Sequence, residues 1–405
     1  MVTPMRRACI GLCLLALGGA TAVAVQSVAE AGTVNGTAVT TIRPSAPQAD
    51  LDKAVADHYT AWKANFLRNG TCTAGWYQVY SPDTSVPYVA EGQGFGMVVT
   101  AYLADHTAFD GLLAYVLAHP SVNNADLMAA EQDLTCKNIN GGDSATDGDL
   151  DIAYALLVAH DQWGSAGTYN YLSLATKRIN AIKKSEVNPT THLMLLGDWA
   201  TPDIGSLYYV SRTSDWMLDH FRAFQGWTGD ADWATIRTAH QNLVKTLQSK
   251  YASSTGLLPD FVQDTNTSTP KPAQGEVLES EYDGAYYWNA CRDPWRRGVD
   301  AVLYGDAQST TAVQKMNTWI KSKTGSNPTK ITAGYSLSGT ALDSENNAAF
   351  FAPFAVAAMT ASSSQAWLDA LWSLMAATSI GSDAYYSGSI LLQVMMLISG
   401  DYWVP

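Results

Sequence analysis

Apolar residues recur every three or four positions along almost the whole chain beyond Leu51, and this spacing is typical of amphipathic helices. The pattern runs from Leu51 through Val55, His58 and Trp62, and it returns over 149–163. It predicts further helices at about 96–106, 111–119, 166–184, 214–226, 231–251, 294–304, 309–322, 346–359, 364–375 and 388–399. Strand patterns are confined to 207–210 and 330–335. The sequence therefore predicts an all-α protein.

Eleven or twelve helices joined by short loops indicate a series of helical hairpins. Such hairpins can stack into an open solenoid or close into a double ring, and the chain has no repeat of fixed period to support the solenoid. A closed ring of six hairpins suits the number of helices better. The inner helices of such a ring would be apolar on nearly all sides, as 149–163 and 348–359 almost are. We expect one domain over 51–405.

The first residues have the pattern of a targeting segment. A basic pair, Arg6 and Arg7, is followed by an apolar run and then by the small-x-small pattern that ends at Ala31. We interpret 1–31 as a secretory signal peptide, with an uncleaved membrane anchor as the alternative. The segment 32–50 is rich in Thr, Ala and Pro and is expected to be a flexible arm. The mature protein would be secreted to the extracellular space, without a membrane attachment.

Export implies an oxidising compartment, where disulfides persist. Cys72, Cys136 and Cys291 remain beyond the predicted signal peptide. A Cys72–Cys136 disulfide is possible, which would leave Cys291 as a small buried thiol.

Composition narrows the choice of partners. Acidic residues outnumber basic ones 37 to 24, and a formal net charge of −13 argues against binding to nucleic acid or to an anionic membrane. The seven histidines are scattered, without an HExxH motif or a cysteine–histidine cluster of zinc spacing, so we expect no metal and no cofactor. The chain has thirteen Trp and twenty Tyr, most of which we expect in the core, but such rings also stack on sugars. This composition modestly favours a carbohydrate enzyme.

Three segments contain residue types that can act in catalysis or binding. In the first, 88–97 (YVAEGQGFGM), three glycines allow close approach of another chain, and Glu91 precedes a helix. Glu91 alone could be a helix N-terminal carboxylate stabilised by the helix dipole. In the second, 145–157, Asp147, Asp149 and Asp151 exceed what helix capping requires, and the glycine and glutamate of a calcium loop are absent.

The third segment, 278–296, mixes acidic, aromatic and arginine residues ahead of a helix. Taken alone, its glutamates Glu279 and Glu281 could belong to a solvated acidic loop.

Together these segments resemble the signatures of glycoside hydrolase family 8. EGQGFGM matches the family's E-G-x-G-[YF]-G-M, and ATDGDLDIA at 145–153 matches A-[ST]-D-[AG]-D-x-x-[IM]-A. YYWNACRDPWR at 286–296 resembles a third signature, and 212–224 resembles a fourth. The resemblance implies an (α/α)6 barrel of six helical hairpins that hydrolyses β-1,4-linked glycans with inversion. Inversion needs a carboxylic acid on one side of the bond and a carboxylate that activates water on the other.

Site roles follow from the same resemblance. Glu91 stands at the position of the catalytic acid, and Asp147 at that of an aspartate that holds the reacting sugar. The chain departs from one branch of the family at Asn289, where an aspartate base would stand. It resembles the branch whose base is a glutamate of the preceding loop, so Glu279 is expected as the base, with Glu281 second and Asp283 third. Substrate contacts are expected from Asp149, Asp215, Trp216, Glu281, Tyr287, Asn289 and Arg292.

The branch with asparagine includes chitosanases and β-1,3-1,4-glucanases. We therefore expect a monomeric, secreted endo-β-1,4-glycosidase with a polysaccharide partner, chitosan in the first place. The alternatives are a β-glucanase acting on lichenan or cellulose derivatives, and a non-catalytic glycan-binding module in which Asn289 marks a lost base.

Overall fold

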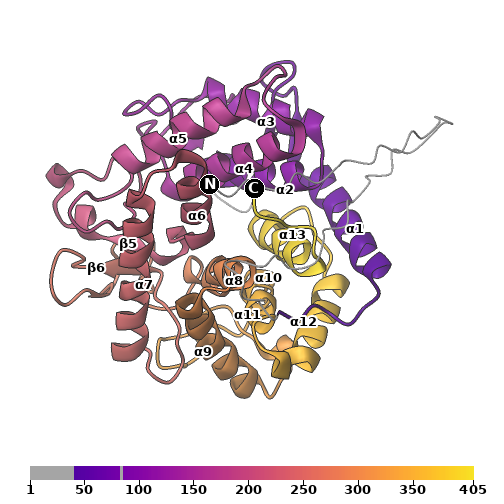
Figure 1. Ribbon diagram of the computed structural model, residues 1–405, viewed down its shortest axis with the longest axis vertical. Coiled ribbons are helices and arrows are strands. Elements are labelled where there is room, and N and C mark those ends of the chain that lie inside the picture. Colours follow the sequence, from indigo (N-terminus) through magenta and orange to yellow (C-terminus); the bar gives the residue numbers. More distant parts are fainter. Residues whose placement is uncertain (1–40, 83–84) are drawn as a thin grey trace, which may run out of the picture.

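The computed structural model describes residues 41–82 and 85–405, so the predicted signal peptide and residues 32–40 lie outside the described part. Helices form two concentric rings, seen end-on in Figure 1. The inner ring consists of α2 (Ala90–Tyr102), α4 (Thr146–Trp163), α6 (Leu218–Thr228), α8 (Asp293–Tyr304), α10 (Ala348–Phe351) with α11 (Pro353–Ala358), and α13 (Tyr385–Ser399). The outer ring consists of α1 (Gln48–Phe66), α3 (His106–Ala118), α5 (Tyr171–Ser185), α7 (Asp232–Lys250), α9 (Ala307–Thr324) and α12 (Gln365–Ala377).

The inner ring is closed. Each inner helix contacts the next one along the chain, and α13 contacts α2. Each outer helix packs on its inner neighbour, and the last pair joins α13 to α1, from opposite ends of the described chain. The predicted (α/α)6 barrel of six helical hairpins is therefore confirmed.

Burial follows the predicted division between the rings. In α4 every residue from Thr146 to Ala159 is buried, because helices surround it on all sides. In the outer helix α1 only one face is buried, through Leu51, Val55 and Trp62 among others. The expected helix 346–359 is interrupted at Ala352, since the following Pro353 has no N–H and its ring crowds the preceding turn.

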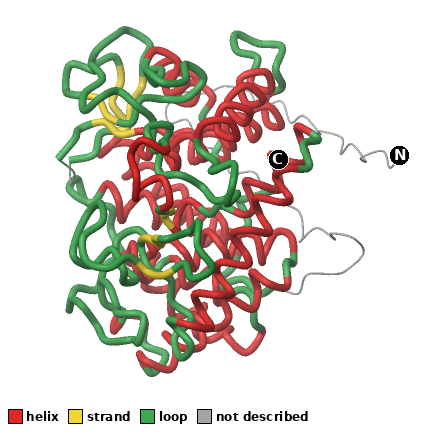
Figure 2. Tube along the Cα trace, turned by 90° about the vertical axis from the view of Figure 1, so that its left-hand side faces the viewer, coloured by secondary structure: helices red, strands yellow, loops and turns green. Residues whose placement is uncertain are grey.

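Short strands and single helical turns occupy the loops. The strands are β1 (Leu67–Asn69), β2 (Tyr77–Val79), β3 (Tyr88–Val89), β4 (Glu131–Gln132), β5 (Ser211–Arg212), β6 (Phe261–Gln263) and β7 (Lys271–Pro272), all paired antiparallel as β1–β2, β3–β4 and β5–β6–β7. The 3-10 segments are η1 (Pro202–Tyr209), η2 (Thr213–Asp215), η3 (Ala290–Arg292), η4 (Pro328–Lys330) and η5 (Ser362–Ser364). Figure 2 shows the strands and most loops towards the left of the view and the C-terminus at the right.

Both strand predictions are wrong in detail. The segment 207–210 ends the 3-10 segment η1, and the strand begins only at Ser211. Of 330–335, only Tyr335 makes isolated bridges, to Tyr286 and Ala341. Local β propensity was overridden in both places by packing against the barrel.

Residues 41–47, the described part of the expected arm before α1, lie along the barrel. The Ile42 N–H donates to the carbonyl of Met359, and Ser45 donates to Asp369 through both its N–H and its hydroxyl. Cys72 and Cys136 form the disulfide that the sequence left open, and Cys291 is a buried free thiol. None of the described helices is long and apolar enough to cross a membrane.

Candidate active site

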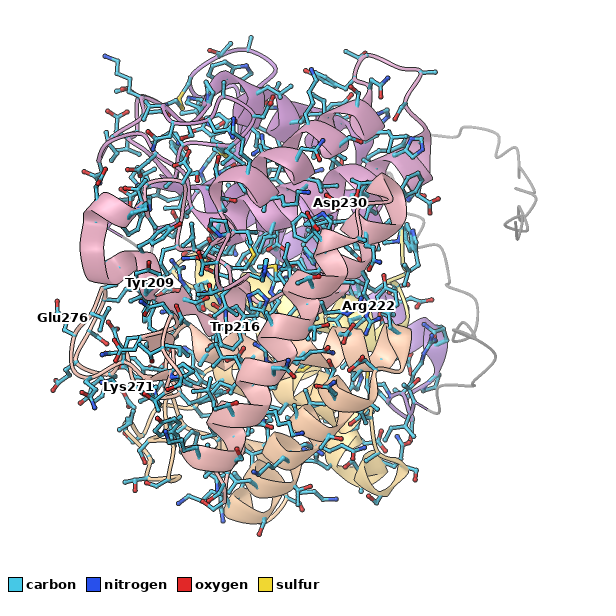
Figure 3. All side chains as sticks on the ribbon, turned by 60° about the vertical axis from the view of Figure 1, so that its left-hand side comes forward. Tyr209, Trp216, Arg222, Asp230, Lys271 and Glu276 are labelled. Atoms are coloured by element: carbon cyan, nitrogen blue, oxygen red, sulfur yellow. A yellow bond between two sulfur atoms is a disulfide. The ribbon has the colours of Figure 1, made fainter. Side chains whose placement is uncertain are left out.

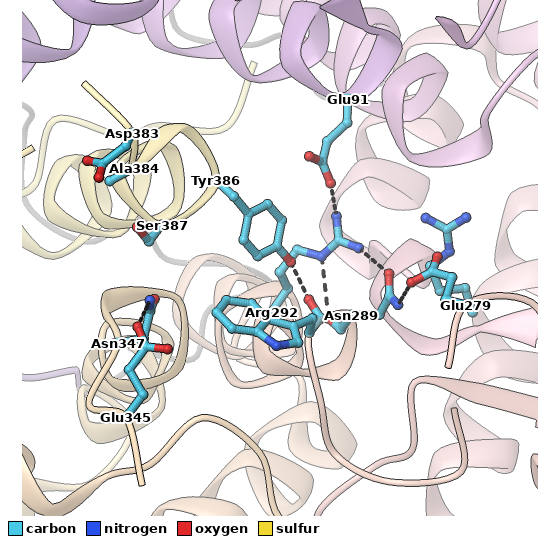
Figure 4. Close-up of a pocket in the computed structure, with 12 residues that line it drawn as sticks. Glu91, Glu279, Asn289, Arg292, Glu345, Asn347, Asp383, Ala384, Tyr386 and Ser387 are labelled. Atoms are coloured by element: carbon cyan, nitrogen blue, oxygen red, sulfur yellow. Dashed lines mark hydrogen bonds and ion pairs between the residues drawn. The ribbon is translucent and has the colours of Figure 1, made fainter. Parts of the chain in front are cut away.

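A cavity of about 630 Å³ lies where the inner helices begin (Figure 4). Its lining comes from Glu91, Arg212, Glu279, Trp288, Asn289, Arg292, Glu345, Asn347, Asp383, Ala384, Tyr386 and Ser387. Glu91 stands in the first turn of α2, Arg292 and Asn347 directly precede α8 and α10, and Tyr386 lies in the first turn of α13. Helix N-termini carry partial positive charge, which favours the carboxylates gathered here.

The glycines of the two helical motifs allow α2 and α4 to approach closely. A Cβ on Gly148 would lie 2.6 Å from the carbonyl carbon of Ala90, and one on Gly94 would lie 2.9 Å from Cβ of Asp151. Only glycine fits at these two positions. The contact places the N-termini of α2 and α4, with Glu91 and Asp147, side by side.

Glu91 is held at both carboxyl oxygens. Nη1 of Arg292 donates to Oε2 at 2.6 Å, and the Tyr385 hydroxyl donates to Oε1 at 3.1 Å. Burial raises the pKa of Glu91 to about 7; Arg292 opposes the rise and the charge of Asp147 adds to it. Glu91 can therefore carry a proton near neutral pH, as a general acid must.

Asp147 differs from Glu91 in the direction in which its pKa is shifted. Its Oδ2 accepts from Arg212 at 3.3 Å and from Arg292 at 3.2 Å, and its Oδ1 accepts from the Gly148 N–H at 2.9 Å. Burial alone would raise the pKa of Asp147, but the two guanidinium groups outweigh it and the pKa lies below its usual value. Asp147 is thus a fixed negative charge beside a proton-holding Glu91.

Glu279 reaches the cavity from the loop that follows β7, and it is connected to Glu91 through two side chains. Nδ2 of Asn289 donates to Oε2 of Glu279 at 2.7 Å, and Oδ1 of Asn289 accepts from Nη2 of Arg292 at 3.0 Å. Arg292, only 1% exposed, in turn donates to Glu91 (Figure 4). Glu279 itself is exposed to solvent.

The structure separates the three carboxylates of this loop. Asp283 is fully buried and accepts four backbone N–H groups of residues 277–280, so it does not face the cavity. Glu281 is exposed and does not line the cavity. Of the three, only Glu279 lines it. Figure 3 shows Glu276, in the same loop, at the outer edge of the molecule.

Several predicted substrate contacts are corrected because their side chains are buried away from the cavity. Asp149 is fully buried and accepts from Met128 N–H at 3.0 Å and from Arg178, so it joins α4 to α5. Trp216 is fully buried and donates to the Ser211 hydroxyl at 2.8 Å.

Asp215 and Tyr287 lie near the cavity without lining it. Asp215 is fully buried, and its Oδ2 lies 3.7 Å from Nε of Arg212. Burial raises the pKa of Asp215 to about 7. Tyr287 is half-buried against Tyr282, while its neighbour Trp288 lines the cavity. Asn289 and Arg292 are the predicted contacts that do line it.

Other lining residues escaped the sequence analysis. Tyr386, Glu345 and Asp383 come from the part of the chain beyond residue 296, where no motif pointed to chemistry. The one sequence feature that could have drawn attention to Tyr386 was its position at the start of an apolar helix.

Asp260, the residue directly before β6, was also missed. It is buried and accepts from the N–H groups of Tyr287, Asn289 and Ala290, and from Nδ2 of Asn289 at 3.3 Å. Nothing in its local sequence marks such a role.

The arrangement can perform acid–base chemistry on a bound ligand. It offers a protonatable carboxyl, Glu91, and three solvent-facing carboxylates, Glu279, Glu345 and Asp383, in the same cavity. Of these three, Glu279 is the one connected to Glu91, through Asn289 and the Arg292 guanidinium. In the described part of the chain no group of three His, Cys, Asp or Glu side chains is arranged to hold a metal ion.

Comparisons with known proteins agree with this geometry. Residues 46–400 match the model of glycosyl hydrolases family 8. A beta-glucanase of Niallia circulans is 43% identical over 361 residues, covering 88% of this chain and 86% of that protein. An endoglucanase of Bacillus sp. (strain KSM-330) is 38% identical over 372 residues, covering 88% and 78%.

Among solved structures, the apo β-1,3-1,4-glucanase of Paenibacillus sp. X4 superimposes with a TM-score of 0.87 at 40% identity, covering 94% of this chain and 98% of that one. The matched region contains the whole inner ring and every residue that lines the cavity. The chain therefore belongs to family 8 of the glycosyl hydrolases and is a glycoside hydrolase.

Proposed function

We propose that this protein is an inverting endo-β-glucanase that cleaves β-1,4 bonds of mixed-linkage β-1,3-1,4-glucan, with Glu91 as the acid and Glu279 as the base. The observation that carries the proposal is the pair of unlike carboxyls in one cavity. Glu91 is largely buried, with a pKa raised by burial to about 7, whereas Glu279 is exposed and held by an amide donor. Inversion requires this division between an acid and a base.

In the proposed reaction a water molecule, held by Glu279, attacks the anomeric carbon of the bound sugar. Glu279 accepts a proton of this water while the bond from the anomeric carbon to the glycosidic oxygen breaks. Glu91 donates its proton to the departing oxygen. Asp147, with its lowered pKa, remains ionised and stabilises the positive charge that develops on the sugar ring.

The choice of β-glucan over chitosan is supported by the relatives. The chain is 43% identical to a beta-glucanase and 40% identical to a β-1,3-1,4-glucanase whose structure it matches over 94% of its length. We rank chitosan second for this reason, although the sequence alone placed it first.

One observation keeps chitosan as a second candidate. On the side of the cavity away from Glu279, Glu345 and Asp383 are exposed, and in the described residues neither forms an ion pair (Figure 4). Two carboxylates without a cationic partner in a substrate cavity would attract protonated glucosamine units, although Glu345 also accepts from Nδ2 of Asn347 at 2.7 Å. They have no comparable effect on a neutral glucan.

A substrate panel tests this choice. Reducing-sugar release is measured on lichenan, carboxymethyl cellulose, soluble chitosan and xylan, and the highest kcat/KM is expected on lichenan. The double variant Glu345→Gln, Asp383→Asn should lose activity on chitosan only, with lichenan as the internal control. A higher kcat/KM on chitosan than on lichenan would reverse the ranking. Binding without product on every polysaccharide would favour the non-catalytic module.

The assignment of the base has its own test. Glu279→Ala should abolish turnover of lichenan, and sodium azide should partly restore it by replacing the lost base. Glu281→Ala is the matched control, since Glu281 is an exposed glutamate of the same loop outside the cavity. If Glu281→Ala were inactive and Glu279→Ala active, the proposed roles would be exchanged.

We further propose that the protein is secreted. The proposal is supported by the signal-peptide pattern of 1–31 and by the Cys72–Cys136 disulfide, which is typical of oxidising compartments. Expression of the full chain with mass spectrometry of the product in the medium tests it. A product that begins near Gly32 is expected, and retention of the intact chain in the cell would contradict it.

A further inference from the structure

The loop that carries Glu279 has little packing of its own. Its residues Glu276, Leu278, Glu279 and Glu281 are all exposed. Among residues 276–281 only Val277 packs against a hydrophobic cluster, at the edge of the small one formed by Leu196, Val210, Phe261 and Ala273. A loop with so few apolar contacts needs another means to hold a catalytic side chain in place.

Asp283 supplies such a means. Its Oδ2 accepts the N–H groups of Val277 and Leu278, both at 2.8 Å, and that of Glu279 at 3.1 Å; its Oδ1 accepts from Ser280 at 2.9 Å. One fully buried carboxylate therefore binds four successive backbone N–H groups. Hydrogen bonds to an ionised acceptor are the stronger kind, and here they fix the turn of the loop.

Asp283 is itself anchored to the barrel. Its carbonyl accepts the Phe261 N–H of β6 at 2.8 Å. At the next residue, Gly284, a Cβ would lie 2.0 Å from the carbonyl oxygen of Ala273, so the backbone packs there with no room for a side chain. The loop is thus fixed to the β5–β6–β7 sheet at the residue whose carboxylate binds its N–H groups.

We infer that Asp283 is a positioning residue that acts through Glu279, by fixing the backbone from which the base reaches the cavity. The inference rests on the proposed role of Glu279. Asn289 then holds the carboxyl end of Glu279 at 2.7 Å, and Asp283 holds its N–H at 3.1 Å, so the base is fixed at both ends. Asp283 does not touch the substrate itself.

A double-mutant cycle tests the inference on lichenan. Asp283→Ala should lower kcat by about 10–10²-fold with KM changed less than about twofold, because a displaced catalytic group costs turnover rather than binding. In the Glu279→Ala background, measured with azide as the rescuing agent, Asp283→Ala should change the rate less than about twofold. The loss disappears there because the group that Asp283 positions is gone.

Asp133→Ala is the matched control. Asp133 also accepts backbone N–H groups of its own loop, from Thr135 at 2.8 Å and from Lys137 at 3.0 Å, but it does not line the cavity. It should leave kcat unchanged. If Asp283→Ala does not fold, Asp283→Asn is measured instead. The amide keeps one acceptor oxygen, but its NH2 group is a donor and cannot accept a hydrogen bond from the backbone N–H groups. It should show a smaller loss of the same kind.

The outcomes separate the inference from the proposed function. Activity in Glu279→Ala without azide would refute the proposed base. If Glu279→Ala is inactive and rescued while Asp283→Ala keeps wild-type kcat, only the inference fails. An equal loss in both backgrounds also overturns it, because Asp283 would then act independently of Glu279.

Discussion

Asn289 donates from Nδ2 to Oε2 of Glu279 at 2.7 Å, and this contact explains how an asparagine can stand where another branch of the family has its base. The amide cannot take a proton from water. Its other contacts, to Arg292 and to Asp260, fix its orientation. Asn289 therefore acts as a rigid holder for a glutamate that comes from a neighbouring loop.

Replacing Asn289 with Asp should lower activity. The change puts an acceptor where a donor now faces Glu279, and two carboxylates at this distance repel each other. Asn289→Asp should reduce kcat on lichenan about 10–10²-fold, as expected for a displaced catalytic group. Steady-state kinetics measures it, and a variant with wild-type kcat would show that the contact does not serve catalysis.

Glu91→Gln should cost about 10²–10⁴-fold or more in kcat, since general acid catalysis contributes that much. The amide keeps the shape of the side chain, so substrate binding should be largely retained. Turnover of lichenan and its KM are the quantities to measure. A variant with more than about a tenth of wild-type kcat would refute the assignment of the acid.

Tyr385→Phe should move the alkaline limb of the pH–activity profile to higher pH. The Tyr385 hydroxyl donates to Oε1 of Glu91 and lowers its pKa from the value that burial alone would give. As the proposed acid, Glu91 is active in its protonated form, so activity should fall as pH rises through its pKa, which lies at about 7. Without the hydroxyl the proton is kept to higher pH. A limb that stays or moves to lower pH contradicts this role.

The protein should be more stable in mild acid than in mild alkali. Burial raises the pKa values of Glu91, Asp215 and Asp260 to about 7 in the folded state. In the unfolded chain such groups lose their protons near pH ~4, so between ~4 and ~7 the folded state binds more protons and the free energy of unfolding falls as pH rises. Burial lowers the pKa of His240 from 6.5 to about 3. Between these two values the ionisation of His240 makes the free energy of unfolding rise with pH, but this is one group against three carboxyls.

Urea denaturation at about pH 5 and about pH 8 measures this difference. The higher free energy of unfolding is expected at the lower pH. Equal values, or a higher value at the alkaline end, would show that these carboxyls ionise in the folded protein as they do in the unfolded chain.

The sequence was sufficient for the architecture because helical spacing is a local property. The pattern of α4, apolar on nearly all sides, predicted an inner helix. The glycines around Glu91 predicted close approach of another chain, which Gly94 makes with Asp151 of α4. The strand expected at 207–210 failed because a strand as short as β5, with two residues, depends on tertiary contacts.

The site was predictable only where motifs marked it. Glu91, Glu279, Asn289 and Arg292 meet in one cavity, although they come from segments about 200 residues apart along the chain. Sequence spacing could not show that Trp216 faces the core, because a buried and a sugar-facing tryptophan have the same local pattern. Positions such as Asp260 depend on long-range backbone contacts that no local pattern encodes.

The anomeric form of the first product tests the central claim most directly. Proton NMR is recorded during the first minutes of lichenan hydrolysis, before the sugar end mutarotates. If water attacks with Glu279 as base while Glu91 protonates the departing oxygen, the new reducing end appears first as the α-anomer. An initial β-anomer would mean retention through a covalent intermediate, and the acid–base pair proposed for Glu91 and Glu279 would be wrong.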